Sequence, residues 1–289
     1  MSFFKTLFGG GKSQTDDSKD TVKRDFDVLK YDGVRALRSG HADYAVQCLE
    51  HALEINGDLE CRDYLSQAYI STGNLAEAYR QLACMAEARP DNAPIVLRMA
   101  DVAYMMEDYD AMAEACAKAL TIDDSEPLAY YMSARAAHGR ADNETAVSML
   151  DKALQLADDY HAARLLRGEI RLADNFVAEA AEDAARLLAE VEGNEDVLLL
   201  NARVAEAGGD HDKALNMYGA VIDADPFCMA AYSERGAVRA ALGDAQGAAD
   251  DEAMAADLSA SASAVQENVE QKVKQTYKNI DPYGIFNNG

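Results

Sequence analysis

Small side chains recur along this chain at a constant spacing. Counting back from Ala248 in steps of 34 gives Ala214, Ala180, Ala146, Met112 and Ala78, and one step of 33 then gives Ala45. A second small position lies twelve residues earlier in each unit, from Gly236 back to Gly33, and a third position lies seven residues later. Of these 21 positions, 17 hold Gly, Ala or Ser, far more than this composition supplies by chance. The chain is therefore built from internal repeats.

Each repeat predicts two amphipathic helices of about 14 residues joined by a short turn. Glycines fall at the expected turn in four of the units, and Pro90 and Pro226 stand where the next unit begins, because proline cannot continue a helix. The small residues are expected where two helices approach closely. The pattern thus predicts seven helical hairpins over residues 26–259. The four turn glycines are Gly40, Gly73, Gly209 and Gly243.

The last unit, "YSERGAVRAALGDAQGAADDEAMAADL", resembles the tetratricopeptide repeat (TPR) in its "Y..RG....LG....A" form. The resemblance extends over all seven units, although Met112 replaces the aligned alanine in one of them. It implies an all-α fold, a right-handed α-solenoid of about seven 34-residue helix-turn-helix units with a C-terminal capping helix. It also implies a protein that binds other proteins in the concave groove lined by the first helix of each unit.

The two ends of the chain differ from the repeats. Residues 1–25 are rich in Gly, Ser, Lys and Asp and are predicted to be a flexible tail. Four large apolar residues within this tail leave open an alternative, an adaptor attached to a membrane surface, although so short a segment would bind weakly. Residues 260–279 are predicted to be a capping helix, and residues 280–289 a C-terminal tail that could itself occupy the groove. The apolar residues are Phe3, Phe4, Leu7 and Phe8 in the first tail and Val265, Val269, Val273 and Tyr277 in the capping helix.

The charge of the chain argues against several classes of partner. It has 27 Lys and Arg against 51 Asp and Glu, a formal net charge of −24, and 49% hydrophobic residues. Such a field repels nucleic acid and anionic lipid, so we expect neither as a partner, while the hydrophobic content indicates a folded protein. The five scattered cysteines and the lack of an export signal predict a cytoplasmic protein. We expect it to be a monomer or a weak homodimer.

Motifs that carry chemistry are missing from the sequence. It contains no CxxC pair, HExxH, GxSxG or GxxxxGK[ST], and "GGGK" at Gly9 to Lys12 lacks the strand and helix that a phosphate loop needs. We therefore predict no cofactor, no metal, no small-molecule substrate and no enzymatic activity. An enzyme with an unrecognised site is the disfavoured alternative.

The resemblance also indicates which side chains line the groove. Met132, Leu166 and Leu200 share the sixth slot of the first helix in three successive units and are predicted to form an apolar strip for an amphipathic helix. Their neighbours at the fifth slot are expected either there or between helices. A clamp for an acidic carboxyl terminus, as in some TPR co-chaperones, is not expected, because only Lys30 and Arg98 of five clamp positions match. The predicted partner-binding residues are Tyr64, Arg98, Tyr104, Tyr131, Met132, Arg135, Leu166, Leu200 and Arg203.

Overall fold

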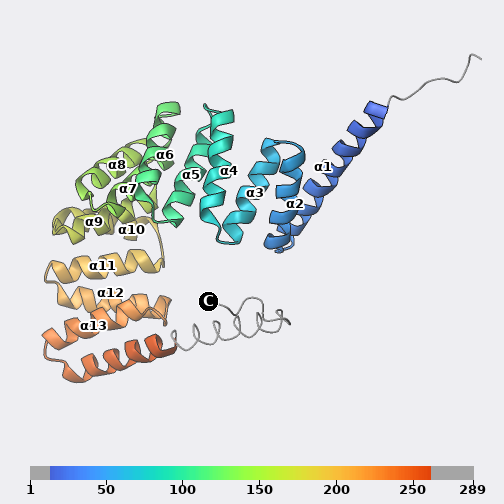
Figure 1. Cartoon of the computed structure of the whole chain (residues 1–289). Helices are drawn as coiled ribbons and strands as arrows, with labels where there is room; N and C mark the ends of the chain where they lie inside the picture. The colour runs from blue at the N-terminus through green and yellow to red at the C-terminus, as the bar shows by residue number, and fades with distance from the viewer. Residues whose placement is uncertain (1–13, 262–289) are drawn as a thin grey trace, which may run out of the picture. The chain divides into compact units, whose positions relative to one another are not determined.

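The structure is a computed structural model that describes residues 14–261, with side chains from residue 20 onward. Within that range the chain is helical apart from short turns, and it contains no strand (Figure 1). The helices are α1 (Gln14–Arg38), α2 (Ala42–Ile55), α3 (Leu59–Ser71), α4 (Leu75–Ala88), α5 (Ala93–Met105), α6 (Tyr109–Ile122), α7 (Pro127–Gly139), α8 (Asn143–Leu156), α9 (His161–Ala173), α10 (Val177–Glu190), α11 (Glu195–Ala207), α12 (His211–Ala224) and α13 (Met229–Ala241), and a last helix runs from residue 245 to at least residue 261.

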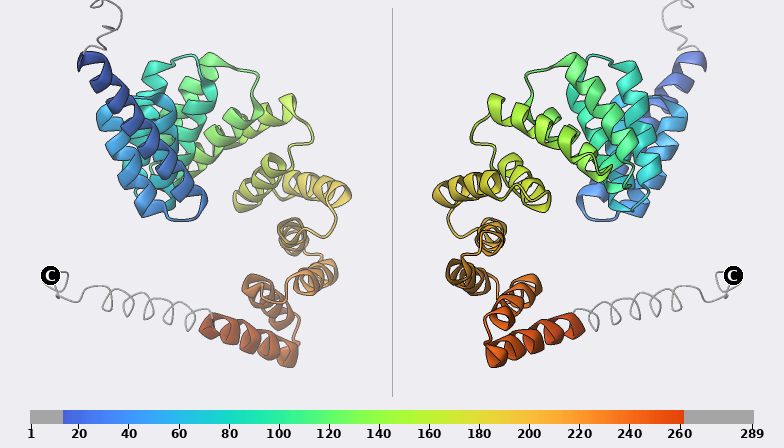
Figure 2. Two further views of the ribbon diagram at one scale, coloured as in Figure 1. Left: turned by 90° about the vertical axis from the view of Figure 1, so that its right-hand side faces the viewer. Right: turned by 90° about the vertical axis from the view of Figure 1, so that its left-hand side faces the viewer.

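The chain divides into two compact units, Met1–Asp159 and Tyr160–Gly289, referred to as unit 1 and unit 2. Unit 1 contains α1 to α8, and unit 2 contains α9 to α13 and the last helix. Within each unit every helix packs on the one before it, and α1 with α3, α5 with α7 and α9 with α11 also touch. Figure 2 shows these hairpins from two further sides. Such stacking of consecutive helix pairs is the all-α solenoid that the sequence predicts.

The turn inside each hairpin is made the same way seven times within the described residues. The first helix ends two residues before a residue with positive φ, and the next amide bonds back to the carbonyl five residues earlier, as His41 N does to Ala36 O at 2.9 Å. Four of these positions are the predicted glycines. The other three are not glycine. The φ values are 76° at Gly40, 76° at Gly73, 57° at Glu107, 58° at Ala141, 66° at Asn175, 78° at Gly209 and 85° at Gly243.

Replacing Ala141 by Gly is expected to stabilise the protein by about 0.5–1 kcal/mol, because the left-handed backbone crowds a Cβ and glycine has none. The free energy of unfolding in urea measures the gain. The control is Ala117→Gly at an exposed position inside α6, which should lose about 1 kcal/mol. A loss at both positions would show that the left-handed turn is not strained.

The predicted small positions lie where helices meet at short range. A Cβ added to Gly168 of α9 would lie 2.8 Å from Leu200 Cδ2 and 3.3 Å from Asp183 Cβ, closer than atoms normally pack. Ala146 and Ala214 are completely buried. The period of small residues therefore marks helix contacts, as the sequence indicates.

Replacing Ala146 by Leu is expected to destabilise unit 1 by about 1–3 kcal/mol, because three added methyl-sized groups have no room between α7 and α8. Urea denaturation followed by circular dichroism measures the loss. Ala117→Leu, at an exposed position of α6, supplies the same side chain without the clash and should be nearly neutral. If the two variants are equally stable, Ala146 is not tightly packed between α7 and α8.

The first helix differs from the prediction. Residues 1–25 were expected to be a flexible tail, but α1 begins at Gln14, so residues 14–25 are helical. The physical reason is that these residues contain neither Gly nor Pro, so nothing interrupts the helix of the first repeat. The apolar residues Phe3 to Phe8, most of the predicted capping helix and the C-terminal tail lie outside the described residues.

Candidate functional site

The first helices of the hairpins in unit 1 bring several of the predicted residues together. Tyr131 and Arg135 are one turn apart on α7, and Tyr104 is at the end of the neighbouring α5. The Arg135 guanidinium carbon lies 3.6 Å from the centre of the Tyr104 ring and 5.7 Å from that of Tyr131. Tyr109 meets Tyr104 edge-on, with ring centres 6.4 Å apart. Stacking between a guanidinium and aromatic rings holds this arginine in place.

Exposed apolar side chains occur on the same two helices as this stack. Tyr104 is 39% exposed, Met105 beside it 50%, and Leu128, one turn before Tyr131 on α7, 40%. Aromatic residues, methionine and arginine are the residue types that protein interfaces favour. Tyr104, Met105, Leu128, Tyr131 and Arg135 are named the tyrosine–arginine surface below.

Arg98 lies on α5 and is bound to α3, the first helix of the preceding hairpin. It forms an ion pair with Asp63 of α3, and its Nη2 donates to Ser66 Oγ at 3.0 Å. Desolvation raises the pKa of the Asp101 carboxyl, and the positive charges of Arg135 and Arg98 act in the opposite direction. Asp101 is thus close enough to both arginines for their charges to act on its carboxyl, and Arg98 is also paired with Asp63.

The remaining predicted residues of unit 1 have other roles. Tyr64 is half-buried and packs against the hydrophobic core of the unit. Lys30 Nζ lies 2.8 Å from Asp58 Oδ1 and 2.7 Å from Glu60 Oε2. Both cations that match the carboxylate clamp, Lys30 and Arg98, are therefore already paired with carboxylates of the chain itself.

The predicted apolar strip is wrong for two of its three residues. Met132 and Leu200 are each only 1% exposed and belong to the packed interior, and Leu166 is half-buried. Leu200 packs on Gly168, where its Cδ2 fills the space that a Cβ would need. Adjacent residues on a helix point about 100° apart, so the sixth slot turns into the helix contact while the fifth-slot Tyr131 stays half-exposed.

Arg203 of α11 is also bound within the chain. Its Nε and Nη2 donate to the two carboxylate oxygens of Glu234 on α13, at 2.8 and 2.7 Å. These hydrogen bonds raise the pKa of the guanidinium. Because Nε and Nη2 both bind Glu234, Arg203 links two hairpins of unit 2 and meets the surface as one half of an ion pair.

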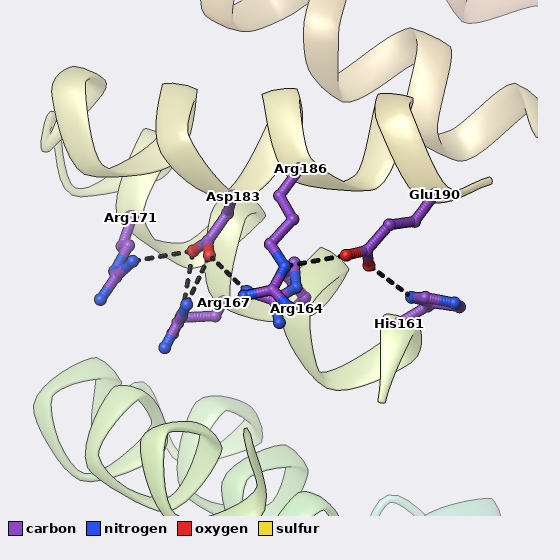
Figure 3. A network of polar contacts seen from close by, with 7 residues as sticks. All are labelled: His161, Arg164, Arg167, Arg171, Asp183, Arg186 and Glu190. Atoms are coloured by element: carbon purple, nitrogen blue, oxygen red, sulfur yellow. Dashed lines mark hydrogen bonds and ion pairs between the residues drawn. The ribbon is translucent and has the colours of Figure 1, made fainter. Parts of the chain in front are cut away.

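A buried ionic network in unit 2 was not anticipated from the sequence (Figure 3). Asp183 of α10, with 2% of its side chain exposed, accepts from Arg167 Nε at 3.0 Å and from Arg171 Nη1 at 2.8 Å, and Arg164 Nη1 lies 3.8 Å from it. The three arginines follow one face of α9. Beside them, Arg186 Nε donates to Glu190 at 2.9 Å.

The same network recurs two repeats later in the chain. Asp251 in the last helix, 4% exposed, accepts from Arg235 Nε at 3.0 Å and Arg239 Nη1 at 2.9 Å. The positions correspond one by one, since Arg235, Arg239 and Asp251 lie two repeat periods after Arg167, Arg171 and Asp183. This doubled spacing was a signal in the sequence that could have revealed both networks.

Two further observations bear on chemistry and location. Within residues 14–261, no three His, Cys, Asp or Glu side chains gather closely enough to hold a metal ion. Over the same range, no helix combines the length and the apolar character needed to cross a lipid bilayer.

Comparison with known proteins gives likenesses in structure alone. No protein-family model and no curated protein matches the sequence. A tetratricopeptide repeat protein from Parabacteroides merdae superposes with a TM-score of 0.67 at 16% identity, over 81% of this chain and 93% of that one. PilW, a type IV pilus biogenesis factor, gives 0.60 at 19% identity over 68% and 90%. YrrB, described as a TPR protein with an unusual peptide-binding site, gives 0.52 at 19% identity over 61% and 91%.

These likenesses agree with the repeat period, the consecutive helix pairs and the recurring geometry of the turns. At such identities they speak for the fold and not for a shared partner. The chain has the fold of the tetratricopeptide-repeat proteins.

Proposed function

We propose that this protein is a non-catalytic scaffold that binds a protein or peptide partner at the tyrosine–arginine surface of unit 1. The observation that carries the proposal is the stack of Arg135 on Tyr104, with Tyr131 beside it and with Met105 and Leu128 exposed on the same two helices. Tyrosine and arginine contribute most often to the energetic centre of protein interfaces. An arginine that is already held in place loses little freedom when a partner binds.

The partner that fits this surface best is an amphipathic helix with an apolar face and mixed charge. The exposed apolar groups offer contacts for the apolar face, and Arg98 and Arg135 are balanced by Asp63 and Asp101, so neither sign dominates. The peptide-binding site named for YrrB supports a peptide as the class of partner. The charge of −24 disfavours nucleic acid.

Two of the cysteines are too weakly acidic to act as catalytic thiols. Burial raises the pKa of both Cys61 and Cys116 to about 11, so each is a neutral thiol at physiological pH and a poor nucleophile. All five cysteines are free thiols, and we propose that the protein works in the reducing cytoplasm. Attachment to a membrane through Phe3 to Phe8 remains the alternative, and co-sedimentation with liposomes would distinguish the two.

The test is an affinity capture from the source cells, read by mass spectrometry. Tyr104→Ala combined with Arg135→Ala should lose at least tenfold of the proteins that the wild type retains, since each substitution removes a large contact. The matched control is Tyr44→Ala with Arg80→Ala, which removes one exposed tyrosine and one exposed arginine from α2 and α4. Equal capture by both double variants, with circular dichroism unchanged, would refute the proposed surface.

A further inference from the structure

The outer face of α1 corresponds to the face that packs against the preceding helix in the later hairpins, but on α1 it is exposed. In the later hairpins, the third residue of the first helix is apolar and packs toward the helix before it, and its exposure is 0% at Cys61, 6% at Ile95 and 0% at Ala129 in unit 1, and 3% at Val197 and 0% at Ala231 in unit 2. The equivalent residue of the first hairpin is Val28, which is 53% exposed. Tyr31, three residues further on, is 67% exposed.

The exposed positions of α1 form a continuous stripe with the helical period. Arg24, Asp25, Val28, Tyr31 and Arg35 are exposed and Asp32 is partly so. These six residues are named the α1 stripe. Residues 20–25 are exposed on all sides, and from Phe26 onward the opposite side of the helix packs on α2. Figure 1 shows α1 at the edge of unit 1, and in the left view of Figure 2 it crosses in front of that unit. A terminal repeat usually turns a polar face outward, so valine and tyrosine at the centre of this stripe are unexpected.

The charge of α1 suggests what can approach it. Residues 20–38 carry five basic and four acidic side chains, whereas every even-numbered helix from α2 to α12, and the last helix, has more acidic than basic residues. Two copies of a chain of net charge −24 repel each other over most of their surfaces. The α1 stripe holds two arginines and two aspartates, so it carries no net charge and offers an apolar contact at its centre.

We propose that two copies of this protein form a symmetric dimer by antiparallel packing of their α1 stripes, centred on Val28. In that register Val28 meets Val28 of the second copy, Arg24 meets Asp32 of the second copy, and the Tyr31 hydroxyl donates to Asp25 of the second copy. Each polar contact occurs twice because of the twofold axis. Asp32 already pairs with Arg35 at 3.2 Å, and its second oxygen is available to accept from Arg24 of the second copy.

The symmetry determines the size of the assembly. A contact in which both copies use the same patch closes on itself, so assembly stops at two chains. A head-to-tail contact, with the acidic last helix of one copy on α1 of the next, would instead add copies without limit. The dimer surface lies on α1 and leaves Tyr104, Tyr131 and Arg135 uncovered, so the proposal does not depend on the partner-binding function.

Sedimentation equilibrium of the full chain tests the proposal. Protein concentrations from 1 to about 200 μM span the dissociation constants of weak dimers. The wild type should shift from monomer to dimer. Val28→Glu with Tyr31→Glu should weaken the dimer at least about tenfold, because it buries like charges at the twofold axis. Phe176→Glu, at an aromatic residue of unit 2 that is 56% exposed, should leave the dimer unchanged.

A single cysteine tests the register. Val28→Cys should give a disulfide-linked dimer with oxidised glutathione, while Phe176→Cys and the wild type should not, since only the first places two thiols at the axis. A wild type that stays monomeric over the whole range, assemblies larger than two, or equal weakening by Phe176→Glu would each overturn the proposal.

Discussion

Asp183→Asn is expected to destabilise unit 2 by about 3–5 kcal/mol, because it leaves three guanidinium groups without their shared carboxylate in a place that water scarcely reaches. The side chains of Arg164, Arg167 and Arg171 are 5%, 14% and 19% exposed, and that of Asp183 is 2% exposed. The amide has nearly the shape of the carboxylate, so the loss reports charge and not volume.

Hydrogen exchange of backbone amides provides a local measurement of this loss. Amides of α9 and α10 should lose protection in Asp183→Asn while those of α1 to α6 keep it, because each hairpin is stabilised by its neighbours. Asp251→Asn is the matched variant with two arginines, and its smaller expected loss follows from their greater exposure of 16% and 28%. Asp257→Asn at an exposed position should change protection little. Unchanged protection in all three would mean that the arginines are solvated in the folded protein.

Stability is expected to fall steeply between pH 9 and pH 11. The pKa of Cys61 and of Cys116 is raised by burial from 9.0 to about 11. Above pH 9 the unfolded chain loses these two protons while the folded chain keeps them, so the unfolded state binds fewer protons and the free energy of unfolding decreases as pH rises. Each thiol contributes a slope of about 1.4 kcal/mol per pH unit in this window, and its full stabilisation is present below pH 9.

Urea denaturation at pH 8, 9, 10 and 11 measures this decline. Tyr69 and Tyr218 also have raised pKa values, through desolvation and hydrogen bonds to Glu50 and Glu206, so the interval from pH 9 to 10 isolates the thiols best. Cys61→Ala with Cys116→Ala should flatten the profile there. Cys84→Ala, at a half-buried cysteine, should leave the slope as it was. If the double variant shows the same slope as the wild type, the decline is caused by groups other than these two thiols.

Sequence periodicity predicted the fold because each repeat obeys the same local rules. The positive φ at Gly40, Gly73, Gly209 and Gly243 and the contacts of Gly168 lie where the period of small residues indicated. Glu107 and Ala141 adopt the same turn without glycine, since the packing of both helices outweighs the local cost. The repeat period therefore predicts the position of the turn even where the residue at that position is not glycine.

The candidate site was predicted less well, because a repeat period does not determine how far each helix is rotated. Tyr131 and Met132 are adjacent and both apolar, and only packing decides that Tyr131 joins the surface and Met132 the interior. The stack of Arg135 on Tyr104 joins side chains from two different repeats, a separation in sequence that no helical pattern reports. The start of α1 was missed for a different reason, since the boundary was drawn from the period and not from a helix-breaking residue.

The two ionic networks of unit 2 imply a rule for changes in its length. The positions one repeat period after Arg167, Arg171 and Asp183 hold Asn201, Ala205 and Met217, so hairpins with a charged interior alternate with one that lacks it. Each network joins the two helices of a single hairpin, α9 with α10 and α13 with the last helix. Such a hairpin therefore carries its own charged interior, and the gain or loss of a neighbouring hairpin leaves that interior intact.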